Sequence, residues 1–380
     1  MEVAFNQWQI VHRSFGPDLY GGTSGIALFL AQLNRHRPDP LLEQTARGAV
    51  HQALSRIDDI AKEQRASFYS GWAGVAWALR QLGETMREPS WVKESDRLLD
   101  AQLGAGTDLY QTDIIGGVAG TLSVMLAIWR RTQRQALLDE AIRLGEILLA
   151  RANRADDTMS WTTMHPDSGM QHRDLTGYSH GTAGIALALL ELATATQRKD
   201  FREAAYAAFR YERRWYSPQQ QNWPDFRNDP RAPQQPQAEP SFAMAWCHGA
   251  PGIGLSRLRA YELTGDKEIL LEADAAIQGT YRPMSATGYD NNYSLCHGLG
   301  GNAEVFIVAA HLLKNAQYKS IADYIGQRAI QMIADPREPW PCGVQGGGEA
   351  PSLLLGLAGI GYFFLRLHDP AGVPSVLMVN

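Results

Sequence analysis

The stretch Gly181-Thr-Ala-Gly-Ile-Ala-Leu-Ala-Leu-Leu-Glu-Leu192 places a short glycine turn directly before an apolar run. The same arrangement recurs along the chain of 380 residues, and a recurring unit of this length indicates a repeat architecture. The glycines that close the turns are 49, 46, 64, 68, 49 and 58 residues apart, enough for two helices and two connections each. The sequence therefore predicts seven helical hairpins, whose turns begin at Gly22, Gly71, Gly117, Gly181, Gly249, Gly298 and Gly356.

The apolar runs and the segments between them differ in polarity. The run Ile185–Leu192 is apolar on nearly all sides, as in a buried helix, whereas 135–152 mixes apolar and charged residues at helical spacing. Buried inner helices that alternate with amphipathic outer helices predict an all-α fold, an α/α toroid of about seven inner and six to seven outer helices. We expect one domain over residues 1–380, with all seven glycine turns at one end of the ring.

Two regions depart from the repeat. Residues 217–240 are rich in Pro, Gln and Asp, which favours a solvated loop over a functional lid or a separate domain. The region before Gly21 is too short for an outer helix comparable to the others. We therefore expect an exposed apolar strip beside the first and last units, near Ile26–Leu33 and Tyr362–Leu367, and such a strip predicts an interaction surface.

The composition excludes several classes of protein. A net charge of −5 and a pI near 6.1 argue against a nucleic-acid partner or an anionic membrane surface. No run approaches the roughly 18 apolar residues of a membrane span, and the first residues lack an apolar signal core. The chain has only three cysteines, and this small, odd number argues against a disulfide framework. We expect a cytoplasmic protein.

Reactive side chains gather just before the glycine turns. Cys247 and Cys296 stand at the same place in two related segments, Trp246-Cys-His-Gly-Ala-Pro-Gly252 and Leu295-Cys-His-Gly-Leu-Gly-Gly301. With His297 they would give zinc three ligands and leave a fourth position open, the arrangement of catalytic zinc sites. The competing interpretation is that both cysteines are small buried hydrophobes and His297 a core residue. The repeat favours the metal site.

These motifs resemble those of the lanthionine synthetase cyclase family. The resemblance rests on Gly177-Tyr-Ser-His-Gly-Thr-Ala-Gly-Ile185, Trp246-Cys-His-Gly-Ala-Pro-Gly-Ile-Gly254 and Cys296-His-Gly298, and it runs from about Gly16 to the C-terminus. It is strongest to the cyclase half of bifunctional class II lanthipeptide synthetases. The family fold is a double ring of seven inner and seven outer helices around a zinc ion.

The resemblance implies roles for individual residues. Cys247, Cys296 and His297 match the zinc ligands, His180 the catalytic histidine and Asp113 its acidic partner. His248 is expected either to donate a proton or to hydrogen-bond from behind the ligands. One position departs from the stand-alone cyclases, which carry an arginine four residues before the first cysteine ligand. Ala243 occupies that place here, so another residue such as His248 must supply the arginine's role, or the role is absent.

The implied reaction adds a peptide cysteine thiol to dehydroalanine or dehydrobutyrine and forms a thioether ring, a step of bacterial lanthipeptide antibiotic biosynthesis. A free thiol has a pKa near 8.5, whereas a zinc-bound thiol is deprotonated. His180, with an ordinary pKa near 6.5, suits proton transfer, and Asp113 would orient its ring. The substrate would be a precursor peptide dehydrated elsewhere, and the implied protein partner is a dehydratase, kinase or lyase.

Other functions compete with this one. A glycoside hydrolase of toroidal shape needs two carboxylates, for which the glycine ends offer mainly Asp18 and Asp113 while the cysteines stay idle. A zinc prenyltransferase would lack this order of motifs. A non-catalytic, zinc-stabilised scaffold that binds a precursor peptide or a partner enzyme is the main alternative.

Three further residues receive structural interpretations. Cys342 has no counterpart in the repeat and is interpreted as a spare or structural thiol, and His165 and His172 as surface residues of a polar connector.

Overall fold

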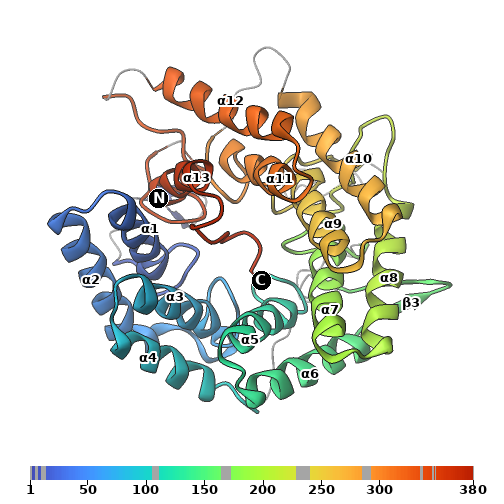
Figure 1. Ribbon diagram of the computed structural model, residues 1–380, viewed down its shortest axis with the longest axis horizontal. Coiled ribbons are helices and arrows are strands. Elements are labelled where there is room, and N and C mark those ends of the chain that lie inside the picture. Colours follow the sequence, from blue (N-terminus) through green and yellow to red (C-terminus); the bar gives the residue numbers. More distant parts are fainter. Residues whose placement is uncertain are drawn as a thin grey trace.

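The computed structural model describes residues 2–4, 7–9, 14–104, 111–163, 173–227, 240–284, 292–333, 337–344, 346 and 348–379. Two concentric rings of helices dominate this part of the chain (Figure 1). The inner ring consists of α1 (Thr23–His36), α3 (Trp72–Thr85), α5 (Val118–Thr132), α7 (Thr182–Thr196), α9 (Ala250–Thr264), α11 (Leu299–Leu312) and α13 (Leu357–His368). The outer ring consists of α2 (Pro40–Ser55), α4 (Pro89–Asp100), α6 (Gln135–Ala150), α8 (Lys199–Arg214), α10 (Lys267–Met284) and α12 (Ala316–Met332).

Each of the first six inner helices packs against the outer helix that follows it, and neighbouring inner helices pack side by side. The ring closes because α1 also contacts α13. The predicted all-α toroid is confirmed. The remaining regular elements are small: η1 (Ile57–Asp59), η2 (Lys62–Gln64), and two antiparallel hairpins, β1 (Glu2–Ala4) with β2 (Gln7–Gln9) and β3 (Asn153–Ala155) with β4 (Thr158–Ser160).

The pattern of burial explains the two rings. Twelve consecutive residues of α7, Thr182 to Ala193, are buried, whereas α8 buries one face and exposes charged residues on the other. A helix that is apolar all round must be covered on every side, and an amphipathic helix can face water. Segment 135–152, predicted as an outer helix, forms α6.

The glycine turns bring the start of every inner helix close to the backbone of the residues just before the turn. All seven inner helices begin directly after the first glycine of a turn. A Cβ atom on the closing glycine would collide with the carbonyl oxygen six residues earlier, at 2.1 Å for Gly184 and 2.0 Å for Gly252. Only glycine allows this approach, which brings the seven turns together at one end of the ring.

The chain beyond α13 runs into the middle of the ring (Figure 1). The Tyr69 hydroxyl donates to the Val376 carbonyl at 2.7 Å, and the indole N–H of Trp246 donates to the Leu377 carbonyl at 3.1 Å. Val376 and Leu377 are buried. The terminal segment therefore fills the centre of the toroid and supports the turn that carries Cys247.

The predicted apolar strip is present in part. Six outer helices occur in the described ranges, and Ile26, Phe29, Leu33 and Phe364 are partly exposed where α1 meets α13. Tyr362 does not belong to the strip, because it is buried and its hydroxyl donates to the Pro374 carbonyl. No helix in the described ranges is both long and apolar enough to cross a membrane.

The solvated-loop prediction for 217–240 is wrong for residues 222–225, whereas residues 218–220 are exposed. Asn222, Trp223 and Asp225 are buried, and the Asp225 N–H donates to the Ser241 carbonyl at 2.7 Å. The buried Trp223 packs with Ala250 and Ile253 of α9, which draws the segment onto the protein. Residues 228–239 of this loop lie outside the described residues.

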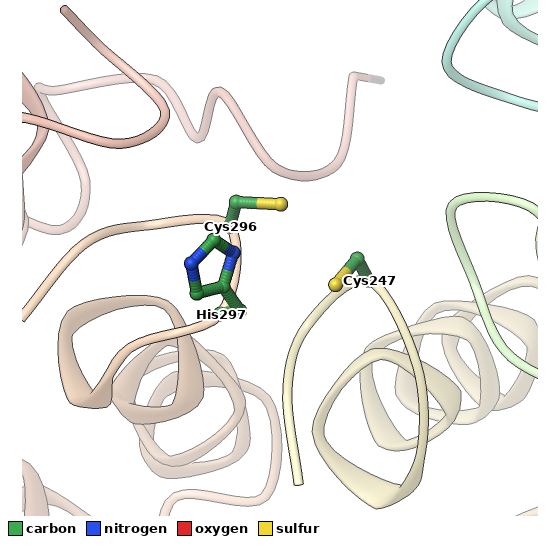
Figure 2. Close-up of side chains that lie close together, drawn as sticks. All are labelled: Cys247, Cys296 and His297. Atoms are coloured by element: carbon green, nitrogen blue, oxygen red, sulfur yellow. The ribbon is translucent and has the colours of Figure 1, made fainter. Parts of the chain in front are cut away.

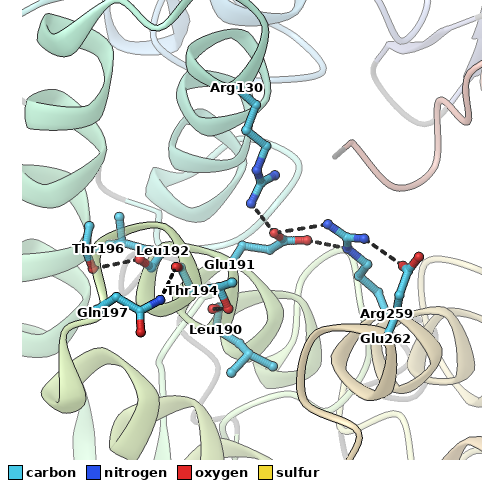
Figure 3. A network of polar contacts seen from close by, with 9 residues as sticks. All are labelled: Arg130, Leu190, Glu191, Leu192, Thr194, Thr196, Gln197, Arg259 and Glu262. Carbon is cyan, nitrogen blue, oxygen red and sulfur yellow. Dashed lines mark hydrogen bonds and ion pairs between the residues drawn. The ribbon is translucent and has the colours of Figure 1, made fainter.

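At the opposite end of the inner helices, charged residues join three of them. The Glu191 carboxylate of α7 accepts hydrogen bonds from Arg130 of α5 and, at 2.6 Å, from Arg259 of α9 (Figure 3). Arg259 also pairs with Glu262 at 2.6 Å. The Glu191 side chain is only 7% exposed, so its charge depends on these arginines.

Candidate metal and catalytic site

A closed belt of backbone hydrogen bonds joins the seven turns. Tyr20 N–H donates to Tyr69 O, and the same bond leads from each turn to the next until Leu354 N–H donates to Tyr20 O, with lengths between 2.9 and 3.3 Å. Each member lies five residues before the closing glycine of its turn. The belt therefore aligns the repeats residue for residue: Tyr20, Tyr69, Ile115, Ser179, Cys247, Cys296 and Leu354.

The belt brings the three predicted metal ligands together. Cys247 N–H donates to Cys296 O at 3.2 Å, so the two thiols come from adjacent turns. Figure 2 shows Cys247, Cys296 and His297 facing one another, and one ligand atom from each lies within 4.8 Å of the others. Among the described residues they are the one group of three or more Cys, His, Asp and Glu side chains that could hold a metal ion.

The surroundings suit a metal. Nε2 of His297 lies 2.9 Å from the Gly343 carbonyl, a bond that a protonated Nε2 donates and that leaves Nδ1 as the ligand atom. The hydrogen bond from Cys247, with smaller contributions from His297 and Tyr20, holds the pKa of Cys296 well below its usual value. The same hydrogen bond, together with burial, raises the pKa of Cys247. Two thiolates and one imidazole are a donor set that zinc accepts, so the residues fit the predicted ion.

His180 and Asp113 meet beside this cluster. His180 follows the belt residue Ser179, and its Nδ1 lies 2.6 Å from Asp113 Oδ2. The Asp113 side chain is fully buried and its other oxygen accepts the Gly116 N–H at 2.9 Å, whereas the His180 side chain is 34% exposed. Asp113 thus fixes the ring and leaves Nε2 of His180 turned away from the carboxylate, available for proton transfer.

His248 stacks on His180, with ring centroids 5.6 Å apart and planes 23° from parallel. It is 1% exposed, and neither ring nitrogen has a hydrogen-bond partner of ordinary geometry among the described residues. Burial, and then the charge of Arg227, lower the pKa of His248 to about 3. The ring is therefore neutral at physiological pH and suited to hydrogen bonding rather than to acting as a cationic acid.

Two further residues lie at the site that were not among the predicted site residues. Burial, followed by the charge and hydrogen bond of Cys296, raises the pKa of Tyr20, which therefore keeps its hydroxyl proton beside the thiolate. Arg227 forms a two-pronged ion pair with Asp225, with Nη2 2.6 Å from Oδ2. The signal for Tyr20 was its place in the repeat, five residues before Gly25. Arg227 lies in an irregular segment and carried no such signal.

The match to known families agrees with this geometry. The sequence profile of the family described as "Lanthionine synthetase C-like protein" matches residues 13–378. The chain belongs to this family.

Curated relatives and solved structures are distant in sequence. The LanC-like chain is 21% identical to the lacticin 481/lactococcin biosynthesis protein LcnDR2 of Lactococcus lactis subsp. lactis, over 97% of the chain but 38% of that protein. It is 22% identical to glutathione S-transferase LANCL1 of Danio rerio, over 93% of the chain and 82% of the relative. The chain thus spans well under half of the first relative's length.

Among solved structures, nisin cyclase superposes with a TM-score of 0.76 at 19% identity, covering 97% of this chain and 93% of that one. An α-1,6-mannanase from Salegentibacter sp. HEL1_6 reaches a TM-score of 0.53 at 13% identity, covering 92% and 99%. At these identities the similarities establish the toroidal fold of the LanC-like chain and nothing about its chemistry.

The remaining predicted residues of the LanC-like chain can now be placed. The Ala243 carbonyl accepts a hydrogen bond from the buried Asn222 side chain at 2.9 Å, so this position anchors the segment that carries Arg227. Cys342 is buried outside the ligand group, with its sulfur 3.9 Å from the Ala350 carbonyl, as a structural thiol would be. His165 and His172 lie outside the described residues.

Proposed function

We propose that this LanC-like protein is a zinc-dependent lanthipeptide cyclase that forms (methyl)lanthionine rings. The observation that carries the proposal is the meeting of Cys247, Cys296 and His297 with the His180–Asp113 pair at one end of the toroid. Zinc bound to the three ligands would present a peptide cysteine as a thiolate at its fourth position. The names of the nisin cyclase and lacticin 481 relatives point to the same chemistry.

His180 would transfer the proton from the substrate thiol to Cα of the dehydro residue. Nδ1 is engaged by Asp113, so Nε2 accepts the proton that leaves the substrate thiol. The sulfur then adds to Cβ of the dehydro residue, the double-bond electrons move toward the carbonyl, and Nε2 returns the proton to Cα. The S–H bond and the π bond between Cα and Cβ are exchanged for one C–S and one C–H bond, and no oxidant or reductant is required.

The two alternatives fit the site less well. In a glycoside hydrolase two carboxylates flank the substrate, but Asp113 is committed to His180 and the Asp18 carboxylate accepts the Gly21 N–H at 2.7 Å. A non-catalytic scaffold needs no histidine held by a buried carboxylate and partly exposed beside the metal ligands. Both features favour catalysis.

The substrate that we propose is a precursor peptide dehydrated by another enzyme, and the proposed partner is a dehydratase, kinase or lyase. Since the chain spans 38% of the lacticin 481 biosynthesis protein, such an activity can reside in the part of that relative that the chain does not match. We propose the cytoplasm as the compartment, because all three cysteines are free thiols and a reducing environment keeps them so.

The test uses a synthetic peptide with one dehydroalanine and one cysteine. With the zinc-loaded protein, the peptide should keep its mass but lose its reactivity toward N-ethylmaleimide, which reports a consumed thiol. The control is the protein in which both Cys247→Ala and Cys296→Ala have been introduced, which should leave the thiol free. Equal rates of thiol loss with the protein and with this control would contradict the proposal.

A further inference from the structure

The segment that bears Arg227 is fastened to the site from both sides. The buried side chain of Asn222 holds the Ala243 carbonyl and, at 2.8 Å, the Ala250 N–H. The Thr176 hydroxyl donates to the Pro224 carbonyl at 2.6 Å. The first contacts secure the turn with Cys247 and His248, and the last secures the turn with His180. The segment is therefore a fixed wall of the site.

The Arg227 side chain is held in a defined direction. Nε lies 3.0 Å from Oδ1 of Asp225, and Nη2 lies 2.6 Å from Oδ2. Asp225 is buried while the Arg227 side chain remains 40% exposed. A guanidinium has five N–H donors, and this pairing uses two of them. The others have no partner among the described residues, which leaves one edge of the guanidinium for a ligand.

Electrostatic interaction links Arg227 to the candidate metal ligands. Against burial, which lowers it, hydrogen bonding to Asp225 and negative charge on Cys247 and Cys296 raise the pKa of Arg227. The geometry agrees, because Asn222 and Thr176 fasten the segment of Arg227 to the turns that carry Cys247 and His180. The buried His248 lies in the adjoining turn, and neither of its ring nitrogens has a partner of ordinary geometry among the residues that the structure describes. Buried polar atoms in native proteins rarely stay unpaired. A ligand atom that accepts a hydrogen bond is therefore expected at this wall.

We propose that Arg227 forms the oxyanion subsite of the cyclase, binding the carbonyl oxygen of the dehydro residue, with Asp225 as the residue that positions it. This inference rests on the proposed function. When the thiolate sulfur bonds to Cβ, the π electrons of the Cα=Cβ bond form a double bond between Cα and the carbonyl carbon, the C=O π electrons move to the oxygen, and an enolate forms. Arg227 stabilises that negative charge until Nε2 of His180 delivers a proton to Cα. A fixed donor aimed at developing charge lowers the barrier without tightening ground-state binding.

The decisive variants are Arg227→Gln and Arg227→Lys. Removing one oxyanion donor costs about 10²–10³ in kcat, so Arg227→Gln should lose that much with KM within about threefold and zinc content unchanged. Arg227→Lys keeps the charge and should recover part of the loss. Asp225→Asn should lower kcat less than Arg227→Gln does, because it loosens the guanidinium but does not remove it.

A matched control exists on the outer side of the protein. Arg198 pairs with Asp200 by the same two-residue spacing, with 3.1 and 2.6 Å contacts and a side chain 34% exposed. Arg198→Gln should leave kcat unchanged. This comparison separates the loss of an arginine–aspartate pair from the loss of charge at the site.

A second readout is independent of turnover. A thiol-free peptide in which a phosphinate replaces the carbonyl of the dehydro residue mimics the enolate charge. It should bind the Arg227→Gln variant about 10–100-fold more weakly than the wild type, while the neutral dehydrated peptide binds both alike. If the wild type forms rings normally and the Arg227→Gln variant has an unchanged kcat, this inference is overturned and the proposed function stands. A wild type that forms no ring would overturn the proposed function and this inference together.

Discussion

The two ends of the inner ring carry different kinds of interaction on the same helices. At the glycine end, backbone hydrogen bonds hold the turns, and two thiols, three imidazoles and the buried carboxylate of Asp113 lie close together. At the other end, long side chains reach between helices, as Glu191 does to Arg130 and Arg259 (Figure 3). Reactive groups need fixed positions, which short turns supply. Ion pairs between long side chains tolerate small shifts and join helices instead. Reactive groups and the ion pairs that join helices therefore lie at separate ends of the inner ring.

The largest effect should come from the metal ligands. Cys247→Ala or Cys296→Ala should lose the single zinc ion and all ring-forming activity, because two remaining ligands hold zinc poorly. The buried Cys342 provides the control: Cys342→Ala should keep its zinc and lose only about 1 kcal/mol of stability. Metal analysis of the purified variants decides the matter. Full zinc content in a protein with both ligand cysteines replaced would refute the site.

The next effect concerns the proton. His180→Ala should retain zinc and fold but lose about 10²–10⁴ in rate, the usual value of a positioned acid or base. Asp113→Asn should lose less, since the ring remains but is no longer fixed in orientation. Asp18 offers a comparison, because it caps the first turn as Asp113 caps the third. Rates for Asp18→Asn should match the wild type, and an equal loss in both aspartate variants would mean that the effect is structural.

The opposite end should respond in stability alone. Glu191→Gln leaves Arg130 and Arg259 without their buried partner and should lower the free energy of unfolding by about 2–4 kcal/mol. Activity per folded molecule should not change. The control is Glu262→Gln, an exposed partner of Arg259 whose loss should be at most about 1 kcal/mol. Urea unfolding monitored by circular dichroism measures both. A fall in kcat at full folding would show that the two ends are coupled.

The last effect is on stability alone and appears only as the pH changes. Glu212 is buried beneath the His180 turn, where one oxygen accepts the Gly177 N–H, and burial raises its pKa from 4.5 to about 8. The folded state therefore favours the protonated acid. Stability from this group is fully present below pH 4.5 and is lost by about 1.4 kcal/mol per pH unit as the pH rises toward 8. Glu212→Gln should remove this slope, so its advantage over the wild type grows from pH 5 to pH 8. A constant difference across that range would contradict the shift.

Much of the site could be predicted from the sequence repeat. Cys247 and Cys296 could be matched because their turns are alike, and His180 and Asp113 because they stand beside equivalent glycines. Arg227 and Tyr20 were not found. Arg227 reaches the site through Asn222 and Trp223, a path set by packing against α9 that has no period in the sequence. Tyr20 comes from the first unit and meets Cys296 of the sixth only because the ring closes.

The fold class, the number of inner helices and the chemical types at the glycine end could be predicted from the sequence, because helical periodicity and the glycine requirement are local properties of the chain. The tertiary structure alone decided which turns become neighbours and how side chains face one another there. Belt closure from Leu354 to Tyr20, the central segment around Val376 and the wall that presents Arg227 all depend on contacts between residues far apart in sequence. Such contacts are set by the closure of the whole ring, and no local pattern of residues records them.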